Sequence, residues 1–146
     1  MGQKLAAKEV QRNLRALTDP FWSTKFRTYA GFSDSIYYLP SVDELDVILK
    51  DEDFVVPVPK HMKQGFDCDD FAYVFKGRSC LYARDNFTPD GSLCLGIAWA
   101  DFSWVNEFHA ANWALCDDLN LYWVEPQDLT RRGAAHCQGN LCLLLV

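Results

Sequence analysis

The sequence lacks any apolar stretch long enough to cross a bilayer, and charged residues interrupt positions 1–20, where a signal peptide would need an apolar centre. It also has no internal repeat, low-complexity tract or domain linker. A myristoylation signal is missing too, since Ala6 stands where serine or threonine is required. These absences predict a cytoplasmic protein with no membrane partner.

Basic residues are few. The chain has 14 Lys and Arg against 20 Asp and Glu, a formal net charge of -6. Nucleic-acid binding needs a clustered basic face, and the only local basic excesses lie at Arg131-Arg132 and in the N-terminal segment. We therefore exclude nucleic acid as the main partner.

The six cysteines are scattered along the chain and lack the density of a disulfide scaffold. Cys137 and Cys142, with His136 beside them, leave open a small loop bridge or a fortuitous metal site. The other thiols are interpreted as mostly reduced core residues.

What the chain does have is enough apolar material for one domain. It has 146 residues, of which 49% are hydrophobic and 14% aromatic, and this excludes a disordered chain. Apolar residues at helical spacing predict a helix before Pro20, and Ser41 with Glu44 forms a capping box for another. From residue 93 the pattern changes to strands, expected over residues 93–104, 109–116 and 119–124. The fold class is therefore α+β, with N-terminal helices followed by an antiparallel sheet.

A further helix is expected to begin at Cys68 and to end at Gly77, with Asp67 as its N-cap. A thiol at a helix N-terminus feels unpaired backbone N–H groups, which stabilise the thiolate. Cys68 is therefore a candidate nucleophile. The alternative is a buried cysteine that behaves as a small hydrophobe.

Two strands supply possible partners for this thiol. A hairpin with its turn centred on Asp117 would place His109 opposite Glu125. A carboxylate on one ring nitrogen orients an imidazole so that the other nitrogen can accept a proton from a thiol. A pairing shifted by one residue would instead put His109 opposite Pro126.

Four segments carry a resemblance to a known family. They resemble the papain-like cysteine protease domain at the C-terminus of fungal agglutinins of the Marasmius oreades agglutinin type, and more distantly bacterial transglutaminase-like cysteine peptidases. The segments are Asp67-Cys68-Asp69-Asp70-Phe71-Ala72, His109-Ala110-Ala111-Asn112-Trp113, Val124-Glu125-Pro126-Gln127 and the stretch from Tyr37 to Leu45. The likeness spans residues 37–127, between an N-terminal helical extension (1–36) and a C-terminal strand (128–146).

The resemblance implies a papain-like or transglutaminase-like fold with Cys68 as nucleophile, His109 as base and Glu125 as orienting acid. It also implies calcium dependence. Clustered carboxylates are suitable oxygen ligands, and one or two of Asp67, Asp69 and Asp70 with a distant acid, Asp51 or Asp53, would bind the ion. The alternative is that these acids only cap the helix. The oxyanion candidate is Gln64.

These observations predict a cysteine hydrolase that cleaves amide bonds of peptides or proteins, and the resemblance implies that calcium activates it. Trp99, Trp104 and Trp113 are candidates to line the substrate cleft, although tryptophans in strands are more often core residues. Three alternatives stay open: a non-catalytic binding or inhibitory module on the same fold, transglutaminase-type acyl transfer, and a cell-wall amidase. Intact Cys, His and acid residues favour activity.

Overall fold

The computed structural model describes residues 1–25, 27–51, 65–87 and 90–146. Its helices are α1 (Ala7–Thr18), α2 (Val42–Lys50) and α3 (Cys68–Asn86), with 3-10 turns η1 (Asp19–Phe21) and η3 (Ala134–His136). Its strands are β1 (Gln3–Ala6), β2 (Tyr29–Gly31), β3 (Ile36–Leu39), β4 (Ser92–Leu93), β5 (Leu95–Phe102), β6 (Phe108–Leu115), β7 (Leu121–Glu125), β8 (Thr130–Gly133) and β9 (Cys137–Leu145). None of the described helices is both long and apolar enough to span a membrane.

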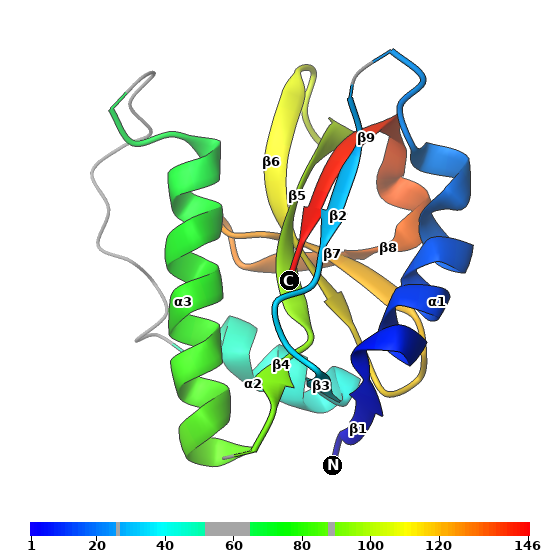
Figure 1. Cartoon of the computed structure of the whole chain (residues 1–146). Helices are drawn as coiled ribbons and strands as arrows, with labels where there is room; N and C mark the ends of the chain where they lie inside the picture. The colour runs from blue at the N-terminus through cyan, green and yellow to red at the C-terminus, as the bar shows by residue number, and fades with distance from the viewer. Residues whose placement is uncertain (26, 52–64, 88–89) are drawn as a thin grey trace.

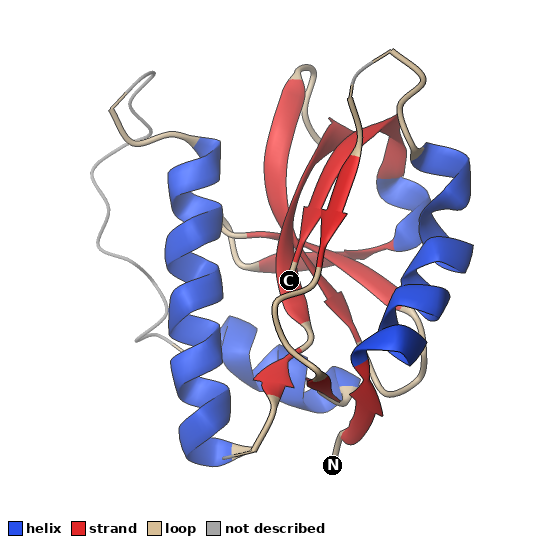
Figure 2. Ribbon diagram, viewed as in Figure 1, coloured by secondary structure: helices blue, strands red, loops and turns tan. Residues whose placement is uncertain are grey.

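The centre of the molecule is a six-stranded sheet in the order β2-β9-β5-β6-β7-β8, antiparallel except where β2 runs parallel to β9. A smaller sheet is formed by β1, β3 and β4. Helix α3 lies on one side of the large sheet and α1 on the other (Figure 1). Figure 2 shows the same layers as helix, sheet and helix. The expected α+β class is confirmed in this coarse form, and the finer papain-like assignment is not.

The N-terminal region is less helical than expected. Residues 1–36 are expected as a helical extension, but Gln3–Ala6 form β1 and pair with β3. After α1 the chain forms η1, a loop and β2. Pairing with strands from distant parts of the chain overrides local propensity here, and it cannot be seen in a sequence window.

Helix α2 begins where its capping box predicts. The Ser41 hydroxyl accepts a hydrogen bond from the Glu44 N–H (3.1 Å), and the Glu44 carboxylate accepts one from the Ser41 N–H (2.8 Å). The Tyr38 hydroxyl also donates to Glu44. Two unpaired donors at the start of the helix are thereby satisfied.

Helix α3 begins at Cys68 after the extended Asp67 N-cap, as predicted. It does not end at Gly77, because it continues to Asn86. The buried residues of this helix recur at three- and four-residue spacing on both sides of Gly77 and cover the sheet: Ala72, Phe75, Ser79 and Ala83. Packing of this face against the sheet stabilises the helix on both sides of Gly77, so the helix does not end at the glycine.

The β6–β7 hairpin forms, but its predicted register is wrong by two residues. Trp113 pairs with Trp123 and Leu115 with Leu121, so the turn is centred on Asp118. Leu119 in this turn has a positive φ of 58°. Side chains alternate with a period of two, so a two-residue shift leaves each on its expected face.

The fold predicts the effect of two glycine substitutions. Gly77 is exposed inside α3, and a Cβ there would meet nothing within 4 Å. We expect Gly77→Ala to raise the free energy of unfolding by about 0.5–1 kcal/mol. As a control, Gly139→Ala should lower it, because Gly139 has a φ of +132°. Urea denaturation measures both. Destabilisation by Gly77→Ala would contradict a helix that runs through residue 77.

Candidate functional site

Cys68 stands at the first position of α3, beside the start of β6. It is half-buried, and its sulfur accepts a hydrogen bond from the Ala110 N–H at 3.5 Å. Ala110 pairs with Trp99 on β5, and the next pair along the ladder joins His109 to Ala100. The helix N-terminus and two strands of the sheet therefore meet at the thiol.

His109 and Glu125 form a buried pair. His109 Nε2 lies 2.7 Å from Glu125 Oε2, and each residue is only 5% exposed. Two other donors hold the same carboxylate: Trp104 Nε1 (2.8 Å) and the Gln127 N–H (3.1 Å). The observed register makes Glu125 the diagonal rather than the direct neighbour of His109. His109 and Glu125 are therefore in contact, as the sequence predicted, although the predicted strand register is wrong.

The pair is ionised at neutral pH. Burial alone would lower the pKa of His109, but its hydrogen bonds to Cys68 and Glu125, with the charge of both groups, raise it to about 9. Burial alone would raise the pKa of Glu125, yet hydrogen bonds from His109 and Trp104 hold it below its ordinary value. The site therefore holds an imidazolium between the Glu125 carboxylate and the Cys68 sulfur.

The acids around Cys68 have separate roles. The Asp70 carboxylate accepts a hydrogen bond from the Asp67 N–H (3.1 Å), so it belongs to the cap of α3. A hydrogen bond that the protonated Asp69 carboxyl donates to Asp67 raises the pKa of Asp69, and burial and the neighbouring negative charge act in the same direction. Potential ligand atoms of Asp67, Cys68 and Asp69 lie within 4.8 Å of one another.

This arrangement fits a hard divalent cation only in part. Asp67 and Asp69 supply the oxygen ligands that calcium prefers, and a cation between them would relieve the repulsion that raises the pKa of Asp69. Asp70 is used as a cap and is not part of the cluster. Of the distant acids, Asp51 is described and half-buried, whereas Asp53 lies outside the described residues.

The three tryptophans differ in position. Trp113 is completely buried among core residues, so the expectation that it lines a cleft is wrong. Trp104 is half-buried, stacks on Phe102 with ring centroids 4.5 Å apart and supports Glu125. Trp99 is half-buried at the site and contacts the ring of Tyr73, centroid to centroid, at 6.2 Å.

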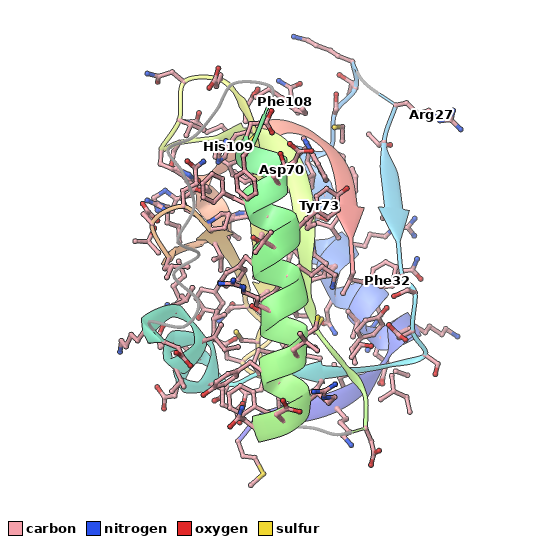
Figure 3. All side chains as sticks on the ribbon, turned by 90° about the vertical axis from the view of Figure 1, so that its left-hand side faces the viewer. Arg27, Phe32, Asp70, Tyr73, Phe108 and His109 are labelled. Carbon is pink, nitrogen blue, oxygen red and sulfur yellow. The ribbon has the colours of Figure 1, made fainter. Side chains whose placement is uncertain are left out.

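Two exposed aromatic residues beside the site were not anticipated. Tyr73 is 51% exposed and Phe108 is 43% exposed. Figure 3 shows both near the N-terminal end of α3, together with Asp70 and His109. Tyr73 follows Ala72 on a face of α3 that does not cover the sheet. An aromatic residue on the polar side of an amphipathic helix is the signal that could have identified it.

The remaining candidate positions are Gln64, His136, Cys137 and Cys142. Gln64, the oxyanion candidate, lies outside the described residues. All six cysteines are free, so Cys137 and Cys142 form no bridge. His136 does not join them in a metal cluster among the described residues, and its Nδ1 lies 2.6 Å from the Ser103 hydroxyl.

The family comparison matches residues 37–131 to the model described as Agglutinin C-terminal. The chain belongs to the agglutinin C-terminal family. None of the curated proteins compared with the chain matches it. The expected link to fungal agglutinins is thus confirmed in its coarse form.

Two solved structures share the fold of this agglutinin C-terminal domain. One is described as "PSL1a-E64 complex", with 26% identity and a TM-score of 0.75. The other is Polyporus squamosus lectin bound to the human-type influenza-binding epitope Neu5Aca2-6Galb1-4GlcNAc, with 25% identity and a TM-score of 0.74. Each covers 98% of this chain, which spans 51% and 49% of the two.

These findings contradict the expectation of a papain-like cysteine peptidase, since the matched family and structures are those of agglutinins and lectins. They favour the non-catalytic alternative. The structure brings Cys68, His109 and Glu125 close together, but the inference from their order to hydrolysis was wrong.

The charged state of His109 can be measured directly. We expect an NMR titration of its ring to give a midpoint near pH 9, lowered by Cys68→Ala and by Glu125→Gln, because each removes a hydrogen-bond partner. This pKa lies above the value of about 6.5 for an unfolded histidine. The stabilisation that His109 contributes is therefore complete below pH 6.5 and lost as the pH rises through 9, whereas that of Glu125, whose pKa is lowered, is lost in acid. A midpoint at or below 6.5 would contradict the buried ion pair.

Proposed function

We propose that this chain is a non-catalytic binding domain of the agglutinin class and that it binds a saccharide at the N-terminal end of α3. The observation that carries the proposal is the group of exposed aromatic rings beside fixed charges, in a domain that belongs to an agglutinin family. Tyr73 and Phe108 stand at this end of α3 (Figure 3).

Sugars have apolar C–H faces and hydroxyl edges, so their sites combine aromatic surface with charged or polar groups. Tyr73 and Trp99 supply a continuous aromatic surface, because their rings are in contact. Asp69 and Asp70, respectively four and three residues before Tyr73 on α3, supply carboxylate acceptors at the edge of this surface. This combination supports a saccharide more than an extended apolar segment.

The buried pair below this surface would set its shape and charge. His109 holds the start of β6 against the end of β7 through Glu125, and Phe108 directly precedes it. Cys68 is tied to the Ala110 N–H on the same strand. In this proposal the thiol, imidazolium and carboxylate are a rigid support for the ligand surface, not a set of reacting groups.

The known ligand of a similar protein supports the choice of probe. Polyporus squamosus lectin is described in complex with Neu5Aca2-6Galb1-4GlcNAc, and this chain corresponds to about half of that protein. The proposal is that this half has a saccharide site of its own. The trisaccharide is therefore the first ligand to test.

Calorimetric titration with this trisaccharide tests the proposal. We expect saturable binding by the wild type and a loss of about tenfold or more with Tyr73→Ala, which removes an exposed aromatic contact. Leu81→Ala is the matched control, because Leu81 is 55% exposed near the other end of the same helix. That variant should bind like the wild type.

Two results would contradict the proposed function. One is the absence of saccharide binding by a folded wild-type chain. The other is cleavage of an unstructured protein such as casein by the wild type but not by Cys68→Ala, since a non-catalytic domain has no such activity. The second assay is run on the same preparations.

We further propose that calcium binds at Asp67 and Asp69 and stabilises this end of α3. The raised pKa of Asp69 beside Asp67 supports the proposal. Calcium at about 100 times its Kd should raise the free energy of unfolding by about 2.7 kcal/mol relative to chelator. Thermal denaturation should show this gain for the wild type but not for Asp69→Asn. Asp43→Asn is the control, because Asp43 is an exposed residue of α2, and this variant should show the same gain as the wild type. Equal melting temperatures with calcium and chelator would contradict it.

A further inference from the structure

A cavity of about 340 Å³ lies between α1 and the β2–β9 edge of the sheet. It is separate from the site at Cys68, because α1 and α3 lie on opposite sides of the sheet (Figure 1). Its floor is apolar, formed by Leu14 of α1 and Leu144 of β9, both buried. The volume suits a ligand of one ring and a short chain.

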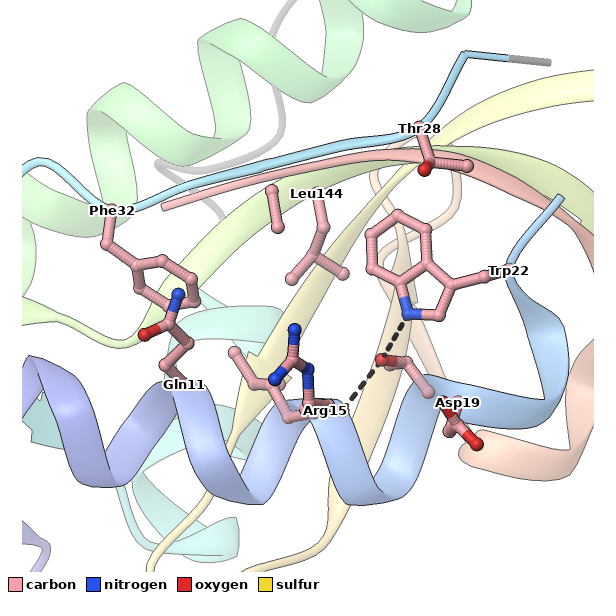
Figure 4. Close-up of a pocket in the computed structure, with 10 residues that line it drawn as sticks. Gln11, Arg15, Asp19, Trp22, Thr28, Phe32 and Leu144 are labelled. Atoms are coloured by element: carbon pink, nitrogen blue, oxygen red, sulfur yellow. Dashed lines mark hydrogen bonds between the residues drawn. The ribbon is translucent and has the colours of Figure 1, made fainter.

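Two aromatic residues line the cavity and are held in place by contacts of their own. Trp22 Nε1 donates to the Thr18 hydroxyl (3.1 Å), and that hydroxyl donates to the Leu14 carbonyl (2.7 Å). Phe32 packs edge-on against Tyr37 with ring centroids 6.2 Å apart. Figure 4 shows the Trp22 and Phe32 rings at opposite ends of the cavity. A ligand would therefore find preformed walls.

One cation faces this apolar space. The Arg15 side chain points from α1 toward Leu144, between the two aromatic rings, and the Asp19 carboxylate is turned away from it (Figure 4). Within the described part of the chain, the arginine ion pairs are those of Arg84, Arg131 and Arg132, so Arg15 has no carboxylate partner there.

The neighbourhood of Arg15 favours an anion, although the chain as a whole carries a formal charge of -6. The adjoining surface of α1 includes Lys8 and Arg12 besides Arg15, against the acid Glu9, and the acid that lines the cavity itself is Asp19. A guanidinium binds a carboxylate through two parallel hydrogen bonds. The charge and the apolar floor together specify an anion with an apolar body.

We propose that this cavity is a binding site for a small aryl carboxylate. The ring lies between Trp22 and Phe32 above Leu144, and the carboxylate pairs with Arg15. This inference does not depend on the proposed saccharide site, because it uses none of the same residues.

The probe is 3-phenylpropanoate, with the neutral 3-phenylpropanamide as its matched control. Binding is followed by the NMR signal of the Trp22 indole N–H, identified with Trp22→Phe. An anion of this size is expected to bind with a Kd of about 1 mM, and the amide about tenfold more weakly. Arg15→Gln should reduce the affinity for the carboxylate about tenfold and leave that for the amide unchanged.

Arg12→Gln is the matched variant, because Arg12 lies one turn earlier on α1 and does not line the cavity. It should bind the amide like the wild type and the carboxylate no more than about twofold more weakly, because only a distant charge is lost. The proposal is overturned if the Trp22 signal does not shift saturably in the folded wild type. It is also overturned if both compounds bind equally, or if Arg12→Gln and Arg15→Gln weaken carboxylate binding to the same extent.

Discussion

The buried ion pair between His109 and Glu125 is the interaction on which this end of the molecule depends. Both residues are 5% exposed, and a buried charge without its partner is strongly destabilising. Two further donors, the Trp104 indole and the Gln127 N–H, satisfy the carboxylate. The pair therefore fixes the start of β6, the end of β7 and the segment that carries Trp104 relative to one another. Cys68 joins α3 to this assembly through Ala110.

Local chemistry explains which parts of the fold could be predicted. The caps at Ser41 and Asp67 are decided within four residues, and both helices begin where these residues indicate. The alternating strands after residue 93 are also found as expected. The end of α3 was not, because burial of Ser79 and Ala83 against the sheet outweighs the local cost of Gly77. Strands β1 and β2 depend on distant partners and leave little trace in their own residues.

The candidate site also contains some residues that the sequence could predict and others that it could not. Cys68, His109 and Glu125 were recognised because their types and order are distinctive, and the two-residue error in register did not separate them. Tyr73 and Phe108 were overlooked because an exposed aromatic residue has meaning only once its neighbours in space are known. Cys68, His109 and Glu125 had suggested hydrolysis, whereas the family is that of agglutinins. A fold can keep a buried group of polar residues while its function depends on the surface around them.

The central claim is that ligand binding occurs at the N-terminal end of α3. The most direct test maps backbone amide shifts by NMR as Neu5Aca2-6Galb1-4GlcNAc is added to the isotope-labelled wild-type chain. The account predicts that the largest saturable shifts fall on Asp69–Tyr73 and Phe108–Ala110, with little change in α1 or α2. Shifts centred on any other surface, or no shifts at saturating saccharide, would contradict it.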